Sequence, residues 1–179
     1  TQFSKYIFNK HWMDFGCGFG FMLDEMASEA RSSVGLEPCL QRATIAKSRG
    51  HMIVNELDQL ADNSIEVVTM FHVFEHLEDP LGTLKSLQRI LCSEGILIIE
   101  VPHARDSLIT LYDCEAFKRF TFWSEHLVLH TQDSLSNILK AAKFQKLEIK
   151  GYQRYSLANH MFWLAKGEPG GDDKYAFLN

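Results

Sequence analysis

The chain has 179 residues, the size of one domain with a sizeable core, and 46% of its residues are hydrophobic. Its formal net charge of −5, without a run of Lys and Arg, argues against nucleic-acid binding, because such a surface must neutralise phosphates. No apolar stretch reaches the ~20 residues of a membrane-spanning helix, and no signal-peptide pattern opens the chain.

Glycines at alternate positions follow the first predicted strand, which ends at Phe15. Gly16, Gly18 and Gly20 allow a sharp turn in which the backbone can lie against a ligand, and Phe21 then opens a predicted helix that runs to Ala30. A strand, a tight turn and a helix N-terminus in this order are typical of a nucleotide-cofactor site. The dinucleotide pattern G-x-G-x-x-G would need a small residue where Phe21 stands, which disfavours a pyrophosphate.

A second predicted strand, from Ser33 to Glu37, ends in a carboxylate 17 residues after Gly20. A carboxylate at the end of the neighbouring strand can accept hydrogen bonds from both hydroxyls of a ribose. Pro38 is expected at the first position of the next helix, which places Glu37 at the corner between strand and helix. This helix is predicted to end at Arg49, before Gly50.

The rest of the chain continues the alternation of strands and helices. Asp79 and Pro80 predict the start of a helix whose buried face carries Leu81, Leu84, Leu87 and Leu91. Thr131 predicts the N-cap of a later helix. Further strands are predicted at 51–54, 65–70, 96–101, 146–152 and 158–165, with 96–101 central and covered on both sides. This pattern predicts an α/β fold with a doubly wound, mostly parallel, seven-stranded sheet and helices on both faces.

Four segments together resemble the class I S-adenosylmethionine-dependent methyltransferases. They are Met13 to Gly20, Val34 to Pro38, Phe74 to Pro80 and Gly95 to His103, and the resemblance covers roughly residues 11 to 150. It implies a Rossmann-like sheet that ends in an antiparallel hairpin. It also implies one methyltransferase domain over residues 1–166, a flexible tail over 167–179, and an N-terminal helix that is incomplete because the chain opens at Thr1.

The resemblance also implies that S-adenosyl-L-methionine is the cofactor. Asp14 would orient the glycine turn or contact the cofactor's amino group indirectly. Glu56 would accept a hydrogen bond from the adenine amino group, with apolar cover from Leu57, and Phe71 and His72 would lie near the methionine end. The predicted cofactor-binding residues are Asp14, Gly16, Cys17, Gly18, Gly20, Glu37, Pro38, Glu56, Leu57, Phe71, His72 and His76.

Methyl transfer to a hydroxyl or an acidic carbon also needs a base, and histidine suits this role near neutral pH. The segment from Phe120 to Thr131 falls where this fold usually builds its acceptor pocket, and its aromatic residues could line that pocket. A loop-tying role for its histidines is as well supported as a catalytic role. The candidate catalytic residues are His103, Glu125, His126 and His130.

The sequence leaves several alternatives open. A nicotinamide-dependent oxidoreductase would share the sheet and the ribose carboxylate, and a noncatalytic cofactor-binding domain would share the whole cofactor site. The four cysteines show no C-x-x-C spacing, which argues against a zinc site or a disulfide framework and favours a cytoplasmic setting; no metal is predicted. The resemblance favours a small-molecule acceptor, with sugars or polysaccharide precursors included, at an O, N or C atom. Exposed aromatics in Phe117 to Trp123 serve a homodimer interface as well as a pocket.

Overall fold

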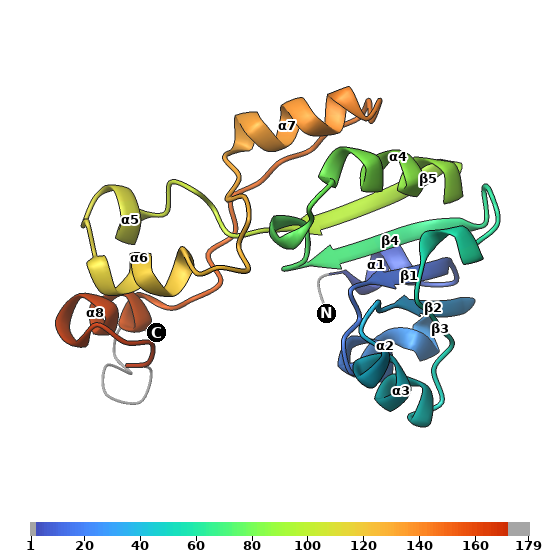
Figure 1. The fold of residues 1–179 in the computed structure, drawn as a ribbon, viewed down its shortest axis with the longest axis horizontal. Coiled ribbons are helices and arrows are strands. Elements are labelled where there is room, and N and C mark those ends of the chain that lie inside the picture. Colours follow the sequence, from blue (N-terminus) through green and yellow to red (C-terminus); the bar gives the residue numbers. More distant parts are fainter. Residues whose placement is uncertain (1–2, 172–179) are drawn as a thin grey trace. The chain divides into compact units, whose positions relative to one another are not determined.

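The computed structural model describes residues 3–171, which form two compact units (Figure 1). The first unit is Thr1–Val101 and the second unit is Pro102–Asn179. One methyltransferase domain over residues 1–166 stays a prediction. Most of the predicted tail, from residue 172 to 179, lies outside the described residues.

The first unit is built on a five-stranded parallel sheet with the strand order β3-β2-β1-β4-β5 (Figure 1). Its strands are β1 (His11–Phe15), β2 (Ser32–Leu36), β3 (Ile53–Val54), β4 (Ile65–Phe71) and β5 (Leu91–Glu100). Its α-helices are α1 (Ser4–Ile7), α2 (Phe21–Met26), α3 (Leu40–Ser48) and α4 (Pro80–Ile90). Short 3-10 turns complete it: η1 (Ala27–Glu29), η2 (Leu57–Gln59) and η3 (Phe74–His76).

The core of the first unit joins the sheet to the helices that follow β1 and β2. Trp12 of β1 and Val67 of β4 belong to one buried cluster with Leu23 of α2 and Ala46 of α3. Complete burial of a large apolar side chain contributes about 1.5–3 kcal/mol, so this cluster anchors the glycine turn between β1 and α2. Helix α4 adds three fully buried side chains, those of Leu84, Leu87 and Ile90.

The second unit is helical over its described residues. Its helices are α5 (Ser107–Thr110), α6 (Glu115–Thr121), α7 (Gln132–Ala141) and α8 (Leu157–Lys166). Phe117 and Phe120 of α6 pack against Trp163 of α8, with ring centroids 5.2 Å apart in both pairs. No helix between residues 3 and 171 is both long and apolar enough to cross a membrane.

The helix-capping predictions are confirmed. The Asp79 side chain accepts a hydrogen bond from the Gly82 N–H at 2.8 Å, at the start of α4. The Thr131 hydroxyl accepts one from the Ser134 N–H at 3.1 Å, at the start of α7. Leu91, predicted on the buried face of α4, instead begins β5, because α4 ends at Ile90 and the chain continues directly as a strand.

The prediction of seven strands with an antiparallel hairpin is wrong for this structure. The segment 158–165 lies in α8, because the Ser156 hydroxyl caps the helix at the Asn159 N–H and Gly167, at φ 73°, ends it. Residues 146–152 form no strand either, because the segment predicted to pair with them is helical and offers no backbone hydrogen bonds to a neighbouring strand. The prediction that 96–101 is a central strand is wrong for the same reason, since β5 lies at the edge of the sheet.

The position of Pro38 also differs from the prediction. Helix α3 begins at Leu40, and Cys39 is its N-cap, so Pro38 lies before the helix and not at its first position. The Glu37 carboxylate accepts a hydrogen bond from the Cys39 N–H at 2.9 Å, and this bond stabilises the turn between β2 and α3. Glu37 nevertheless stands at the predicted turn between strand and helix.

Candidate functional site

All five strands of the first unit are parallel, so the loops that follow them leave the sheet at one edge. The glycine turn follows β1 and Glu37 follows β2, while Glu56 and His72 follow β3 and β4. In open α/β sheets, ligands bind at this carboxyl edge. The structure therefore gathers the predicted cofactor-binding residues in one region of the first unit. Their individual roles stay predictions.

The glycine turn adopts the backbone that its sequence predicts. Gly16, Gly18 and Gly20 have φ values of 76°, 55° and 84°, in the left-handed region that side chains disfavour. The turn is fastened to β2, because the Gly16 and Cys17 N–H groups both donate to the Leu36 carbonyl, at 2.8 and 3.0 Å. A Cβ atom on Gly18 would meet no atom within 4 Å, so this stretch of backbone faces open space where a ligand could lie.

Glu37 is buried, at 4% exposure, and braces the turn. One carboxylate oxygen accepts the Gly18 N–H at 3.0 Å, and the other accepts the Cys39 N–H. The amide of Asn55, after β3, donates to the Glu37 carbonyl at 2.8 Å. An ionised carboxylate offers about four acceptor positions, so two remain for the hydroxyls of a ribose. The residues present therefore fit a nucleoside cofactor.

Two further titratable side chains lie beneath the turn. Burial raises the pKa of Asp14 to about 6, against a smaller lowering by its hydrogen bond from Thr69. Burial, with the nearby charges of Asp14 and Glu37, raises the pKa of the Cys17 thiol to about 12. Cys17 therefore stays a neutral, buried thiol under the glycine turn, whereas Asp14 changes its charge in a mildly acidic range.

The end of β4 carries a group of histidines and glutamates. His72, at φ 55°, places Nε2 3.1 Å from Glu100 Oε1 and Nδ1 3.6 Å from Glu75 Oε1. His76 Nε2 lies 3.9 Å from the same Glu75 oxygen. Glu75 is 1% exposed, and neither of its carboxylate oxygens has a hydrogen-bond partner. Of the Glu75-His76 pair, the glutamate is therefore the buried member and the histidine the more accessible one.

The loop after β3 holds the residues predicted to meet adenine. Glu56 is exposed and Leu57 is partly buried at the start of η2. The Gln59 side chain accepts the backbone N–H groups of Asn55 and Glu56, at 2.7 and 3.2 Å, and so shapes this loop.

The candidate catalytic residues all belong to the second unit. His103 and His130 are bridge partners, and the Ala104 N–H donates to the His130 carbonyl at 2.9 Å. His130 is buried, with Nδ1 3.3 Å from the Ser134 hydroxyl, whereas Glu125 is exposed. His126 is partly buried, with Nδ1 2.7 Å from the Thr121 carbonyl. The structure thus ties His130 to its helix cap and leaves His126 partly exposed.

Sequence reasoning missed two partners of the site. Glu100, at the end of β5, lies next to His72, and its position as an acidic residue after the apolar run Ile96 to Ile99 could have marked it. Thr69, in the middle of β4, donates its hydroxyl to Asp14 at 2.8 Å. No local motif indicates Thr69, because its role depends on the pairing of two strands that are 55 residues apart.

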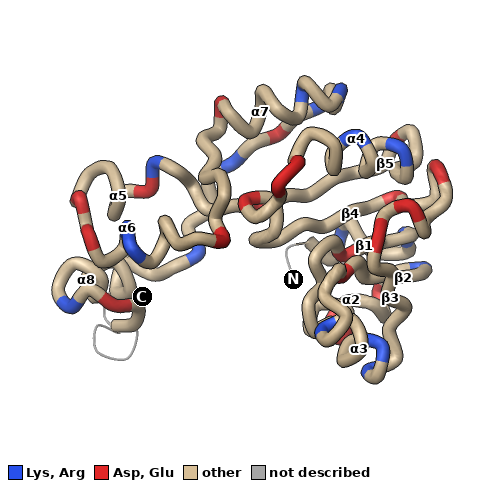
Figure 2. Tube along the Cα trace, viewed as in Figure 1, with Lys and Arg blue, Asp and Glu red and all other residues tan. Residues whose placement is uncertain are grey.

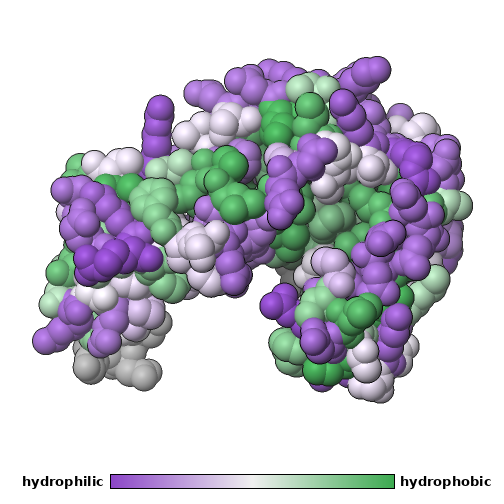
Figure 3. All heavy atoms as spheres, viewed as in Figure 1, coloured by the Kyte–Doolittle hydropathy of each residue, from purple (hydrophilic) through white to green (hydrophobic). Residues whose placement is uncertain are grey.

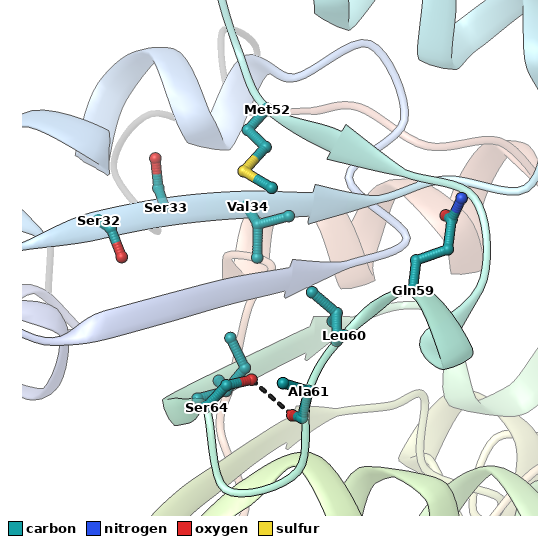
Figure 4. A pocket seen from close by; sticks show the side chains of 9 residues that line it. Ser32, Ser33, Val34, Met52, Gln59, Leu60, Ala61 and Ser64 are labelled. Carbon is teal, nitrogen blue, oxygen red and sulfur yellow. Dashed lines mark hydrogen bonds between the residues drawn. The ribbon is translucent and has the colours of Figure 1, made fainter.

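A pocket of about 270 Å³ lies elsewhere in the first unit (Figure 4). It is lined by the first residues of β2 and β4, so it is at the opposite edge of the sheet from the glycine turn. The Ser64 hydroxyl within it is already satisfied by the Ala61 carbonyl, at 2.7 Å. The pocket contains none of the predicted site residues.

Comparisons with known proteins agree with this arrangement. A family model described as a methyltransferase domain matches residues 5–149. The ubiquinone biosynthesis O-methyltransferase of Haemophilus ducreyi is 28% identical over 109 residues, which are 52% of this chain and 45% of that protein. A probable S-adenosylmethionine-dependent methyltransferase of Mycolicibacterium smegmatis is 32% identical over 99 residues, 51% of this chain and 37% of that protein. The chain thus spans less than half the length of these curated relatives.

Solved structures share the fold. An S-adenosylmethionine-dependent methyltransferase of Thermotoga maritima, described as a possible histamine N-methyltransferase, matches with a TM-score of 0.62 and 23% identity, over 76% of this chain and 65% of that one. A putative methyltransferase of Bacillus halodurans matches with a TM-score of 0.69 and 15% identity, over 99% of this chain and 79% of that one. Since the family model covers most of the sequence, the chain belongs to the methyltransferase domain family of class I, whose methyl donor is S-adenosylmethionine.

Proposed function

We propose that this protein transfers a methyl group from S-adenosylmethionine to an O, N or C atom of a small molecule. The observation that carries the proposal is the glycine turn with its brace. Gly18 exposes open backbone, and the Glu37 carboxylate beneath it keeps acceptor positions for a ribose. Membership of the methyltransferase family supports the same cofactor.

The proposed roles follow from the positions of the side chains. Glu37 binds the ribose hydroxyls, with Pro38 beside it, and Glu56 and Leu57 bind adenine. Asp14 orients the glycine turn or contacts the amino group of the cofactor indirectly. Phe71, His72 and His76 line the methionine end. When bound, the cofactor supplies an electrophilic methyl group, so the protein has only to position the acceptor and to remove its proton.

For the base we propose His126 first, from the set that also includes His103, Glu125 and His130. Its Nδ1 lies at hydrogen-bond distance from a carbonyl, which can only accept, so Nδ1 carries the proton and Nε2 is the basic atom. His126→Asn should lower kcat by about 10²–10⁴-fold with little change in cofactor affinity. An unchanged kcat would move the assignment to another residue of the set.

The proposed acceptor class rests on the name of a relative and on the exposed aromatic side chains of the second unit. The Haemophilus ducreyi relative is named an O-methyltransferase, which makes hydroxyl acceptors the first class to assay, with sugars and polysaccharide precursors among them. Phe120, Phe122 and Trp123 are each between 46% and 57% exposed, and hydrophobic side chains reach the surface in Figure 3. These aromatics suit an apolar acceptor or the interface of a homodimer.

The remaining partners are also proposals. Acidic and basic residues are both scattered along the tube in Figure 2, and the net charge is −5, which supports a small acceptor over a nucleic acid. A cytoplasmic location agrees with four cysteines that are all free in the structure.

The test is calorimetric titration of S-adenosylmethionine and S-adenosylhomocysteine into the native chain, Glu37→Ala and Glu25→Ala. Glu25 is an exposed glutamate of α2 and serves as the matched control. Loss of two charge-assisted hydrogen bonds should weaken binding to Glu37→Ala by about 2–4 kcal/mol, and Glu25→Ala should bind normally. Circular dichroism checks that each variant is folded.

Three results would revise the proposal. A folded native chain that binds neither ligand refutes it, and binding of a nicotinamide cofactor in their place would restore the oxidoreductase alternative. Cofactor binding without methyl transfer to any acceptor of a hydroxyl, amine and carbon-acid panel would indicate a noncatalytic cofactor-binding domain.

A further inference from the structure

Three buried side chains form a hydrogen-bonded line beneath the glycine turn. The Trp12 indole N–H donates to the Thr69 hydroxyl at 2.9 Å, and that hydroxyl lies 2.8 Å from Asp14 Oδ1. Trp12 and Thr69 are fully buried, and Asp14 is 5% exposed. The proposed function does not use the first two residues, and no motif of the sequence marks them.

The strand pairing explains why these side chains meet. Trp12 and Asp14 are two residues apart on β1, so they point to the same face of the sheet. Asp14 is the register partner of Thr69 on β4, which places Thr69 directly beside it. A one-residue change in the register between β1 and β4 would therefore separate the three side chains.

The direction of the hydrogen bonds follows from the donors available. An indole N–H can only donate, so the Thr69 oxygen is the acceptor of that bond. The single hydroxyl proton of Thr69 is then left for Asp14, at 2.8 Å, or for the Met13 carbonyl, at 3.4 Å. The shorter, charge-assisted bond to the carboxylate is the stronger one. Trp12 thus turns the Thr69 proton toward Asp14.

We infer that Thr69, oriented by Trp12, is a positioning residue that holds the Asp14 carboxylate in its ionised form for the amino group of the bound cofactor. This inference rests on the proposed function. A hydrogen bond to the charged form of an acid favours that form, while burial opposes it. Asp14 is buried, so without the Thr69 bond burial would act unopposed, and its carboxyl would be protonated at higher pH.

Two titratable groups near Asp14 bear on the pH dependence. The Cys17 thiol has its pKa raised to about 12, so it stays neutral across the mildly acidic and neutral range. The Glu37 carboxylate lies at the end of the neighbouring strand and accepts two backbone N–H groups. A change in pH dependence that is caused by Thr69 therefore reports on Asp14, which Thr69 contacts directly.

The experiment measures the affinity for S-adenosylhomocysteine from about pH 5 to 8 by calorimetry, which spans the raised pKa of Asp14. In the native chain, affinity should fall as the pH drops through about 6. In Thr69→Val, this midpoint should lie about one pH unit higher, so that affinity near pH 6.5 falls several-fold. Thr69→Ser keeps the hydroxyl and should restore the native profile. Thr44→Val, at an exposed threonine of α3, is the matched control and should not move it.

A second readout does not depend on the cofactor. Carbon-13 NMR of labelled aspartate carboxyls follows the Asp14 titration directly, and Asp14→Asn identifies its signal. The expected result is an Asp14 midpoint near 6 that moves upward in Thr69→Val and returns in Thr69→Ser. An Asp14 titration that is the same in the native chain and in Thr69→Val overturns the inference. A native chain that binds no cofactor, with the NMR shift present, overturns the proposed function and leaves the Thr69 effect on Asp14 established.

Discussion

Gly16 and Gly18 stand two residues apart in the same turn, but alanine should have different effects at the two positions. At Gly16, φ is 76° and an added Cβ would lie 2.4 Å from a Val73 methyl carbon. At Gly18, φ is 55° and the added Cβ would meet no atom within 4 Å. Alanine at Gly16 therefore adds backbone strain and a steric overlap, whereas alanine at Gly18 adds backbone strain alone.

The magnitudes follow from these two causes. A side chain in the left-handed region costs about 1–2 kcal/mol, and overlap with the partly buried Val73 side chain adds about 1–3 kcal/mol, the usual range for overpacking. Gly16→Ala should thus lower the free energy of unfolding by about 2–5 kcal/mol and Gly18→Ala by about 1–2 kcal/mol. Gly50→Ala, at φ 94° with open space around the Cβ, should resemble Gly18→Ala and serves as the matched control outside the turn.

Urea unfolding followed by circular dichroism measures these differences. The double variant Gly16→Ala with Val73→Ala should recover about 1–3 kcal/mol relative to the sum of the single variants, because the overlap is removed and the strain remains. Equal stability of Gly16→Ala and Gly18→Ala would refute the steric argument. Complete recovery in the double variant would refute the contribution of backbone strain.

The same variants separate stability from binding. The open backbone at Gly18 is where we place the cofactor, so an alanine methyl there occupies ligand space. Gly18→Ala should weaken S-adenosylhomocysteine binding at least tenfold, about 1.4 kcal/mol, while Gly50→Ala should leave it unchanged. Equal binding by these two variants would show that the cofactor does not lie against Gly18.

The remaining predictions concern stability. Because the pKa of Asp14 is near 6 in the folded chain and near 3.9 unfolded, the native chain should lose about 3 kcal/mol of stability from this group as the pH rises from about 4 to 6. At neutral pH the free energy of unfolding of Asp14→Asn in urea should exceed that of the native chain by this amount, and near pH 4 the two should be equal. A difference that does not change with pH would contradict the raised pKa of Asp14. Asp79→Ala should remove the N-cap of α4 and lower the free energy of unfolding by about 1 kcal/mol in urea; an unchanged stability would contradict the capping role. Ser156→Ala should lower the free energy of unfolding of the second unit by a similar amount and should reduce its helical circular dichroism signal. If residues 158–165 formed a strand, the helical signal would not change.

The elements that sequence reasoning located well are those with strong local signals. The glycines of the turn act through their own positive φ, and the aspartate before Pro80 and the threonine before α7 each accept a backbone N–H three residues ahead. Glu37 was located by its position after an apolar strand. These signals are short-range, so they survive without knowledge of the tertiary fold.

The failure at α8 has a specific physical cause. The apolar run from Met161 to Ala165 suggests a buried strand, but the buried residues are Ala158, Asn159, Phe162 and Trp163, which is a helical spacing. Ser156 and Gly167 were readable as its cap and its stop. The apolar composition favoured a strand and the capping residues favoured a helix, and the capping residues were correct.

The parts of the site that could not be predicted depend on contacts between distant segments. Val73 restricts Gly16, Thr69 donates to Asp14, and Glu100 contacts His72, across separations of 28 to 57 residues. Each contact needs the strand order of the sheet, in which β1 lies between β2 and β4. A single sequence shows the residues but not which of them become neighbours.

Glu37 has a structural role in addition to its proposed role in binding the ribose. Its carboxylate accepts a hydrogen bond from the Gly18 N–H, and the carbonyl of Leu36, one residue earlier, accepts the Gly16 and Cys17 N–H groups. The turn is thus ordered by the strand that also carries the ribose acceptor. Ordering a loop in advance lowers the entropic cost of binding. The carboxylate at the end of β2 therefore serves the cofactor twice, through the acceptor positions that it keeps free and through the backbone that it holds in place.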